Sequence, residues 1–378
     1  MSTFKRFLQY YKPYKGIFFM DLFCALIMCI VDLSFPLILS YCTGKFFLKS
    51  SNEILKGVLF LGIGLLIMYV IRALCRYYVS CQGHVMGANM ESDMRQDLFN
   101  QYQRLSFSYY DKHNTGVMMS RVVSDLFDIC EFAHHGPENL FISLFKIIGS
   151  FIILATIYWP LALILLAVTV VMMVFSYSQN KKMRRTFMEN RKKIGSVNAS
   201  LQDSLGGIRV VQSFANEDIE IDKFNHSNME FLESKKDNYR VMGTFQGGNN
   251  FFQGLLYVTI IVFGGLFIAN GDLNPIVLAT FALYINVFVS PIEVLVEFTE
   301  MFQKGFSGFR RFEEVMNEVP EIQDSKNAKD LKNVSGNIDF DHVSFQYNEN
   351  EKVIDDVNLH IKAGEKIALV GPSGSGKT

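Results

Sequence analysis

The stretch at residues 140–177 reads LFISLFKIIGSFIILATIYWPLALILLAVTVVMMVFSY and holds a single charged side chain. A helix that spans a bilayer needs about 20 mostly apolar residues, so this stretch is long enough for two. Trp159 and Pro160 divide it near the middle, and a proline inside a helix interrupts its hydrogen bonding. The stretch therefore predicts two membrane-spanning helices, 140–158 and 161–177, that are joined in a tight hairpin.

Four further apolar blocks of similar length lie outside this hairpin. Two precede it and two follow it, and the last two are joined by a short turn from Asn270 to Pro275. Six spans return the chain to the side of the membrane from which it started. The predicted spans are 17–39, 54–79, 140–158, 161–177, 251–269 and 276–296.

Composition excludes several classes of protein. The 378 residues are 49% hydrophobic and 19% charged, with a formal net charge of −1. Nucleic-acid-binding proteins are usually basic, so nucleic acid is not an expected partner. The apolar blocks exclude a wholly soluble enzyme and a disordered chain. The six cysteines lie mostly in or beside these blocks without a C-x-x-C pair, which predicts packing residues rather than metal or redox sites.

Basic residues predict the orientation of the spans. Residues 1–16 carry four lysine or arginine side chains, and segment 178–250 is also rich in them. Cytoplasmic flanks of membrane helices carry an excess of such residues. We therefore expect both termini and both long polar segments, 80–139 and 178–250, on the cytoplasmic side. Residues 1–16 fit an amphipathic helix in the inner interface, with a plain basic flank as the alternative.

The two long polar segments are predicted to be helical. No proline falls within 37–136 or 161–274, so nothing of that kind breaks a helix there. We expect membrane helices that continue far into the cytoplasm and turn near 112–116 and 214–218. Independent soluble loops are the alternative.

The pattern changes after Pro320. A polar stretch is followed by short alternating runs at 337–340, 343–347 and 356–361, and by a compact apolar run at 366–370. Such runs are typical of strands. The fold class predicted for the chain is therefore a multi-span α-helical membrane domain followed by the β-rich N-terminal fragment of a P-loop α/β nucleotide-binding domain.

The last eight residues, GPSGSGKT, match the phosphate-loop pattern G-x-x-x-x-G-K-[ST]. Glycines let backbone N–H groups point inward at a phosphate. Lys377 would reach the β- and γ-phosphates, and the Thr378 hydroxyl would bind Mg²⁺. The predicted phosphate-binding residues are Gly371, Pro372, Ser373, Gly374, Ser375, Gly376, Lys377 and Thr378.

The run that leads into this loop, VIDDVNLHIKAGEKIALV at 353–370, resembles the opening of an ATP-binding-cassette domain. The six spans with two long cytoplasmic extensions resemble the membrane half of an ABC exporter. The resemblance covers nearly the whole chain and is nearest to bacterial multidrug, lipid and peptide half-exporters. It implies an amphipathic helix at 1–16, a membrane domain at 17–305, a linker at 306–336 and a cassette at 337–378.

Two cytoplasmic stretches resemble those that hold the coupling helices of the family. SFSYYD at 106–111, followed by Thr115–Gly116 and Ser120–Arg121, resembles the first, and LGGIRVVQSF at 205–214 leads to the second. The resemblance implies that these turns dock on nucleotide-binding domains; plain helix–helix turns are the alternative. The implied coupling residues are Gly116, Arg121, Asn216, Glu217 and Asp218.

The resemblance also implies ATP and Mg²⁺ as cofactors, with Tyr347 stacked on adenine. A tyrosine on an edge strand is the alternative. In the family, the catalytic glutamate, signature motif and switch histidine follow the phosphate loop. We therefore expect the chain to be truncated at this motif and, as given, unable to hydrolyse ATP, although the full-length protein would be a transport ATPase.

The function implied is half of an exporter in the bacterial cell membrane. It would pair with a second half, identical or different, and move a lipophilic small molecule, lipid or peptide by alternating access, in contact with membrane lipid. The alternative is a truncated, noncatalytic membrane subunit that only pairs with an intact half.

Charges inside the spans need a partner or a purpose, because each costs roughly 2.5–3.5 kcal/mol at mid-bilayer. Asp32 is predicted to face a translocation cavity; pairing with a neighbouring helix or a place near the outer interface are the alternatives. Asp21 and Lys146 are expected to snorkel toward the inner surface, and Arg72 to be interfacial.

His134 and His135 are adjacent in the first long polar segment. The interpretation favoured by the sequence is a polar pair on a cytoplasmic helix. Two histidines alone do not make a metal site, since structural and catalytic zinc sites use three or four protein ligands.

Overall fold

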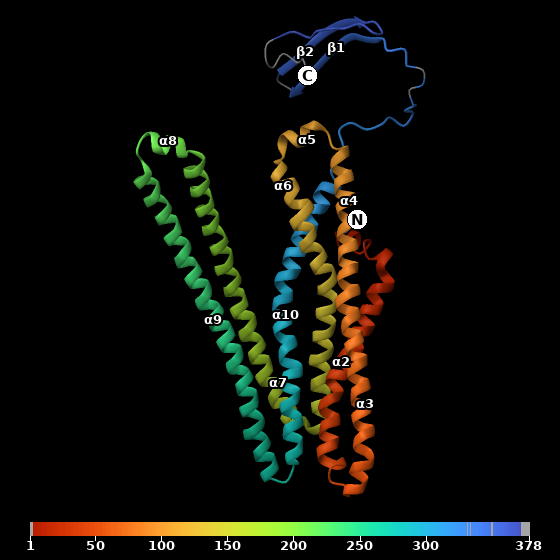
Figure 1. Ribbon diagram of the computed structural model, residues 1–378, viewed down its shortest axis with the longest axis vertical. Coiled ribbons are helices and arrows are strands. Elements are labelled where there is room, and N and C mark those ends of the chain that lie inside the picture. The colour runs from red at the N-terminus through yellow and green to blue at the C-terminus, as the bar shows by residue number, and fades with distance from the viewer. Residues whose placement is uncertain (1–2, 331, 333, 349–350, 372–378) are drawn as a thin grey trace. The chain divides into compact units, whose positions relative to one another are not determined.

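The computed structural model describes residues 3–330, 332, 334–348 and 351–371 (Figure 1). The chain divides into two units, Met1–Pro320 and Glu321–Thr378. The first is helical, and the second contains a two-stranded antiparallel sheet. Five helical runs in the described part are long and apolar enough to cross a membrane. The predicted fold class is confirmed at this level.

The N-terminal residues form two short helices rather than one amphipathic helix. These are α1 at Thr3–Phe7 and the 3₁₀ turn η1 at Lys12–Tyr14. Residues 8–11, between them, form turns. The apolar helix α2 then runs over Lys15–Tyr41 and ends in a π turn, η2, at Cys42–Phe46.

Helix α3, Ser51–Tyr78, begins with a capping box in which Ser50 and Glu53 bond reciprocally. A π turn, η3 at Val79–Gly83, connects it to α4, His84–Arg104. The chain then turns through two six-residue helices. They are α5, Phe107–Lys112, and α6, Thr115–Ser120, followed by a further π turn, η4, at Arg121–Asp125.

The element α7, Leu126–Gly206, comprises two antiparallel helices. Tyr158 has non-helical dihedrals, φ −158° and ψ 96°, and the chain folds back there (Figure 1). The reversal lies next to Trp159 and Pro160, where the apolar stretch is divided. The missing N–H of proline removes a helical hydrogen bond at this point.

The remaining helices also extend well beyond a membrane. The short helix α8, Ile208–Ser213, leads to α9, Glu217–Ala269, and α10 covers Pro275–Met316. At a rise of 1.5 Å per residue, α9 is about 80 Å long, against about 30 Å for a bilayer core. Most of α9 therefore lies outside any single bilayer core.

The helical unit is held by two large apolar clusters. In one, Met86, Met90 and Met94 of α4 pack near Phe309 and Phe312 of α10. The spacing of four places the methionines on one face of α4. The second cluster joins α2, α7, α9 and α10. Its fully buried members include Leu154, Leu161, Leu165, Leu256, Phe281, Tyr284 and Phe288.

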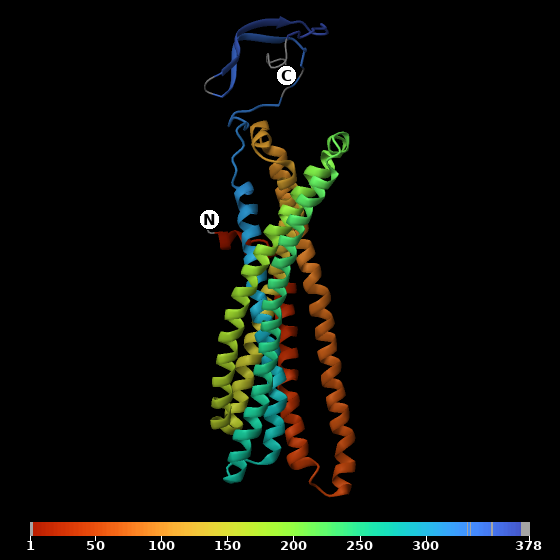
Figure 2. The same ribbon diagram turned by 90° about the vertical axis from the view of Figure 1, so that its left-hand side faces the viewer.

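The second half of α7 and α9 run side by side (Figure 2), and polar contacts join them along their length. Ser176 donates to Asn249 at 2.6 Å, Thr186 donates to Asn238 at 2.9 Å, and Lys193 pairs with Glu230 at 2.9 Å. These contacts hold the two helices side by side where apolar burial is sparse.

The second unit contains β1, Ile338–Asn348, and β2, Glu351–Ile361, paired antiparallel with Asp339 opposite His360. The predicted strand at 366–370 is wrong for the described residues, because this segment has no strand assignment. A strand needs a neighbour for its N–H and C=O groups, and no described residue pairs with this run. Val370 is accordingly 92% exposed.

Candidate functional site

The predicted phosphate loop falls almost wholly outside the described residues. Gly371 is described, whereas Pro372, Ser373, Gly374, Ser375, Gly376, Lys377 and Thr378 are not. The backbone of Tyr347 lies in β1, but its side chain is also outside the described part. The assignment of these residues to ATP and Mg²⁺ therefore stays a prediction.

The first candidate coupling turn lies at the tip formed by α5 and α6. The Asn114 side chain caps α6 by accepting a hydrogen bond from the Gly116 N–H at 2.7 Å. Tyr109 stacks on His113 with ring centroids 4.0 Å apart, and burial raises the pKa of the Tyr109 hydroxyl. The tip is thus an ordered structure and not a loose loop.

An ion pair fastens this tip to α10. The Nε and Nη2 groups of Arg311 donate to the two carboxylate oxygens of Asp125, at 2.6 and 2.7 Å. A second ion pair joins Arg121 to Glu314 at 3.8 Å. Bidentate arginine–carboxylate pairs fix geometry as well as charge. An open groove of about 490 Å³ lies beside the pair and is lined in part by Gly116 and Arg121.

The second candidate coupling turn joins α8 to α9. Ala215 adopts a left-handed φ of 51°, and the Asn216 N–H bonds to the Val211 carbonyl at 3.0 Å. Glu217 and Asp218 occupy the first turn of α9, where acidic side chains stabilise the positive end of the helix dipole.

Both tips lie at the same end of the helical unit (Figure 1) and expose apolar side chains. Phe107 is 88% exposed at the first, and Phe214 is 72% exposed at the second. Other exposed apolar residues near the tips are Val117, Met119, Val123, Leu205, Val210 and Ile219. Exposed apolar groups at the two tips mark surfaces that can contact another domain.

Asp32 is paired with two cations from neighbouring helices. Arg72 of α3 donates its Nε to the carboxylate at 2.7 Å, and Lys146 of α7 approaches it at 2.6 Å. Pairing with a neighbouring helix, one of the alternatives for Asp32, is therefore observed. Lys146 and Arg72 thus have a carboxylate partner within the helical unit, and their expected depth in the membrane stays a prediction.

Asp21 also departs from expectation. It is 3% exposed and does not snorkel, and its Oδ1 has no hydrogen-bond partner among the described residues. The packing of α2 against η3 and α7 encloses it, so that the carboxylate cannot reach the surface.

The structure brings a third histidine to the His134–His135 pair. His84 begins α4, fifty positions earlier in the chain, and its Nδ1 lies 3.2 Å from His134 Nε2. The sequence interpretation of an isolated polar pair missed this residue. One signal in the sequence could have found it. His84 lies five residues after span 54–79, and His135 lies five residues before span 140–158, so both are expected at the same distance from the membrane.

Comparisons with known proteins agree with this architecture. The family model described as the ABC transporter transmembrane region matches residues 18–292. The chain is 38% identical to the uncharacterized ABC transporter ATP-binding protein YwjA of Bacillus subtilis (strain 168), over 99% of this chain and 64% of that protein. It is 26% identical to the ATP-dependent lipid A-core flippase of Syntrophus aciditrophicus (strain SB), over 100% of this chain and 62% of that protein. It is 27% identical to the putative multidrug export ATP-binding/permease protein YgaD of Bacillus subtilis (strain 168), over 100% of this chain and 66% of that protein. The chain thus spans a little under two thirds of the length of these relatives.

Proposed function

The chain belongs to the ABC transporter transmembrane family, whose model covers residues 18–292, and on that premise we propose that it forms one half of an ATP-driven exporter. Its relatives include proteins named as a lipid A-core flippase and as a putative multidrug export protein. The substrate we propose is accordingly a lipophilic small molecule, a lipid or a peptide.

The observation that carries this proposal is the pair of helical extensions that end in short transverse tips. The first passes through α5 and α6, and the second through α8. Their exposed apolar residues, Phe107 and Phe214 among them, suit contact with a nucleotide-binding domain. We assign Gly116, Arg121, Asn216, Glu217 and Asp218 to these coupling contacts.

The Asp125–Arg311 pair supports the same assignment. It ties the base of the first tip to α10, the last helix of the membrane unit. A displacement of the tip is thereby passed to α10 by a fixed contact. In this scheme ATP binds at the phosphate loop with Mg²⁺, Tyr347 stacks on adenine, and a second half completes the transporter.

Transport and ATP hydrolysis by the full-length gene product test this proposal. Inverted membrane vesicles would be assayed for ATP-dependent uptake of lipophilic cations, lipids and peptides. Lys377→Ala is expected to abolish both uptake and hydrolysis, because the phosphates lose their cation. Absence of uptake for every class, with ATP hydrolysis intact, would contradict the export function.

The coupling role has its own test. Phe214→Asp is expected to leave folding intact, because the side chain is 72% exposed, and to lower substrate-stimulated ATP hydrolysis by about tenfold, equivalent to about 1.4 kcal/mol. Met188→Asp, on the shaft of α7 at 66% exposure, is the matched control and should have no such effect. Equal losses in both variants would remove the assignment.

A further inference from the structure

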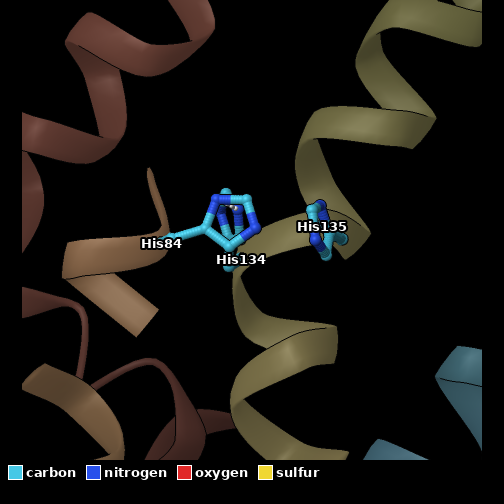
Figure 3. Close-up of side chains that lie close together, drawn as sticks. All are labelled: His84, His134 and His135. Carbon is cyan, nitrogen blue, oxygen red and sulfur yellow. Dashed lines mark hydrogen bonds between the residues drawn. The ribbon is translucent and has the colours of Figure 1, made fainter. Parts of the chain in front are cut away.

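Three histidines meet where α4 and the first half of α7 lie side by side (Figure 3). His84 comes from α4, and His134 and His135 come from α7. Each offers one ring nitrogen, and these three nitrogens lie within 4.8 Å of one another. Three imidazoles at this separation are a donor set that zinc sites use, with the fourth position open.

Two of the nitrogens are already spaced for a shared ion. His84 Nδ1 and His134 Nε2 are 3.2 Å apart. Two nitrogens bound at about 2.0–2.1 Å to one tetrahedral Zn²⁺ lie about 3.3 Å apart. The third nitrogen, on His135, lies within 4.8 Å of the other two, and the His135 ring centroid is 4.1 Å from that of His134.

The backbone makes room for this cluster. Gly83 lies against the His134 ring, and a Cβ at this position would overlap its Cε1 and lie 3.1 Å from Asp21 Oδ1. Gly83 closes the π turn η3, a type of helical irregularity that is frequent at functional sites. Beside it, a cavity of about 280 Å³ is lined in part by His84 and His135, which gives an ion a route of entry.

Carboxylates lie close to the imidazoles of the cluster. His135 Nδ1 lies 3.7 Å from Glu138, and its Nε2 lies 3.8 Å from Glu131. His134 Nδ1 and Asp21 Oδ1 are both buried without a hydrogen-bond partner among the described residues, and both flank Gly83. Histidines that bind a metal usually donate their other N–H to a carboxylate, which fixes the ring.

Three carboxylates and one arginine surround the cluster. The facing charged groups are Asp21 of α2, Arg76 of α3, and Glu131 and Glu138 of α7, while α10 contributes the uncharged Met301 to the cavity. Asp21 and Glu138 are at most 5% exposed. Both carboxylates therefore lie where an imidazole that binds a metal could donate its other N–H.

We propose that His84, His134 and His135 bind one Zn²⁺ ion, with Asp21 and Glu138 orienting the imidazoles. Imidazole donors select Zn²⁺ over Mg²⁺ and Ca²⁺, which prefer oxygen ligands. The ion would tie α4 to α7 at the membrane end of the hairpin that carries α5 and α6. This site is independent of the export function, because binding is measured without ATP or transported substrate.

The test is equilibrium dialysis of the full chain, purified with an affinity tag that contains no histidine and stripped by a chelator. About one Zn²⁺ per chain is expected in a metal assay by mass spectrometry. His84→Ala and His134→Ala should each weaken Zn²⁺ binding at least tenfold, and Glu138→Gln about 10–100-fold. The matched control is His226→Ala, an exposed histidine on α9 beside Glu230.

A second measurement on the unmodified protein separates loss of a ligand from loss of the fold. Zn²⁺ should protect His84, the exposed member of the cluster, from diethyl pyrocarbonate and leave the reaction of His226 unchanged, and Mg²⁺ should protect neither. The proposal is overturned if the unmodified chain binds no Zn²⁺, if a monodisperse His84→Ala/His134→Ala variant binds as much as the parent, or if Zn²⁺ gives no protection.

Discussion

Asp32 shows how a single carboxylate organises charge inside the helical unit. It holds Arg72 of α3 and Lys146 of α7 at once, so three helices meet at one side chain. One anion faces two cations, and the group retains net positive charge. Removal of the anion would leave both cations without this partner.

The first prediction follows from this imbalance. Asp32→Asn is expected to lower the free energy of unfolding by about 1–3 kcal/mol, because the amide cannot neutralise either cation. Thermal unfolding of the purified protein in nanodiscs measures this. The second change in Asp32→Asn/Lys146→Met should recover part of the loss, since it removes one unpaired cation.

An exposed ion pair provides the control for Asp32. Asp237 and Arg240 on α9 lie 2.8 Å apart, with most of both side chains in solvent. Asp237→Asn should change stability by no more than about 0.5 kcal/mol. If Asp32→Asn had no larger effect than Asp237→Asn, the Asp32 group would not contribute to the fold.

The second prediction concerns the exposed pair across β1 and β2. A hydrogen bond from His360 to Asp339 raises the pKa of the imidazole above its usual value. The pair therefore favours strand pairing at low pH, and this contribution disappears as pH rises through the raised pKa. Asp339→Asn should return the pKa of His360 toward about 6.5.

An NMR titration of the histidine ring protons measures this pKa. Asp330→Asn, in the polar segment before β1, is the control and should leave the pKa of His360 unchanged. An unchanged pKa in Asp339→Asn would show that the carboxylate does not stabilise the charged imidazole.

At the scale of elements, close approach of α10 to α7 depends on glycine. A Cβ at Gly305 would overlap the Phe132 Cβ and lie 3.1 Å from the Asp128 carbonyl oxygen. Neither atom is the end of a flexible side chain, so the helices would have to separate. A Cβ at Gly308 would lie 3.1 Å from the Asp125 carbonyl oxygen of η4 and 3.2 Å from Ile129 of α7.

The third prediction is that Gly305→Ala destabilises the protein by about 1–3 kcal/mol, as overpacking does elsewhere. Gly247→Ala on α9 is the matched control. A Cβ there meets nothing within 4 Å, so the change should be neutral or stabilising by up to about 1 kcal/mol. Thermal unfolding measures both, and equal shifts would argue against close packing of α10 on α7.

The elements themselves were largely predictable, because their signals are local. The apolar stretch with Trp159 and Pro160 predicts a reversal, and the chain does reverse at Tyr158. Absence of proline allowed α9 to run unbroken. The predicted strand at 366–370 failed because a strand depends on a neighbour that the run itself cannot specify.

The candidate sites were less predictable, because they depend on contacts between distant residues. Arg72 and Lys146 lie 40 and 114 positions from Asp32, and no local pattern pairs them. His84 joins His134 only because α4 and α7 pack together. Assignment of Gly371–Thr378 to phosphate and of Asn216 to a coupling turn remains a prediction from sequence.

At the scale of the whole molecule, the tips and the turn between α9 and α10 lie at opposite ends of the helical unit (Figure 1). The apolar parts of the helices lie between these ends. Since loops with many basic residues stay in the cytoplasm, the α8–α9 tip is expected inside and the α9–α10 turn outside. One labelled position at each end of the helical unit is therefore enough to test its orientation in the membrane.

The fourth prediction places a cysteine at each end. Asn216 and Asp272 are both exposed, so Asn216→Cys and Asp272→Cys can be labelled without unfolding. A membrane-impermeant maleimide should label Asp272→Cys in intact cells and Asn216→Cys only after the cells are permeabilised. The parent chain is the control, because five of its six cysteines are buried and Cys81 is partly buried. Labelling of Asn216→Cys in intact cells would place the tips outside, where ATP cannot drive them, and would contradict both the orientation and the coupling role.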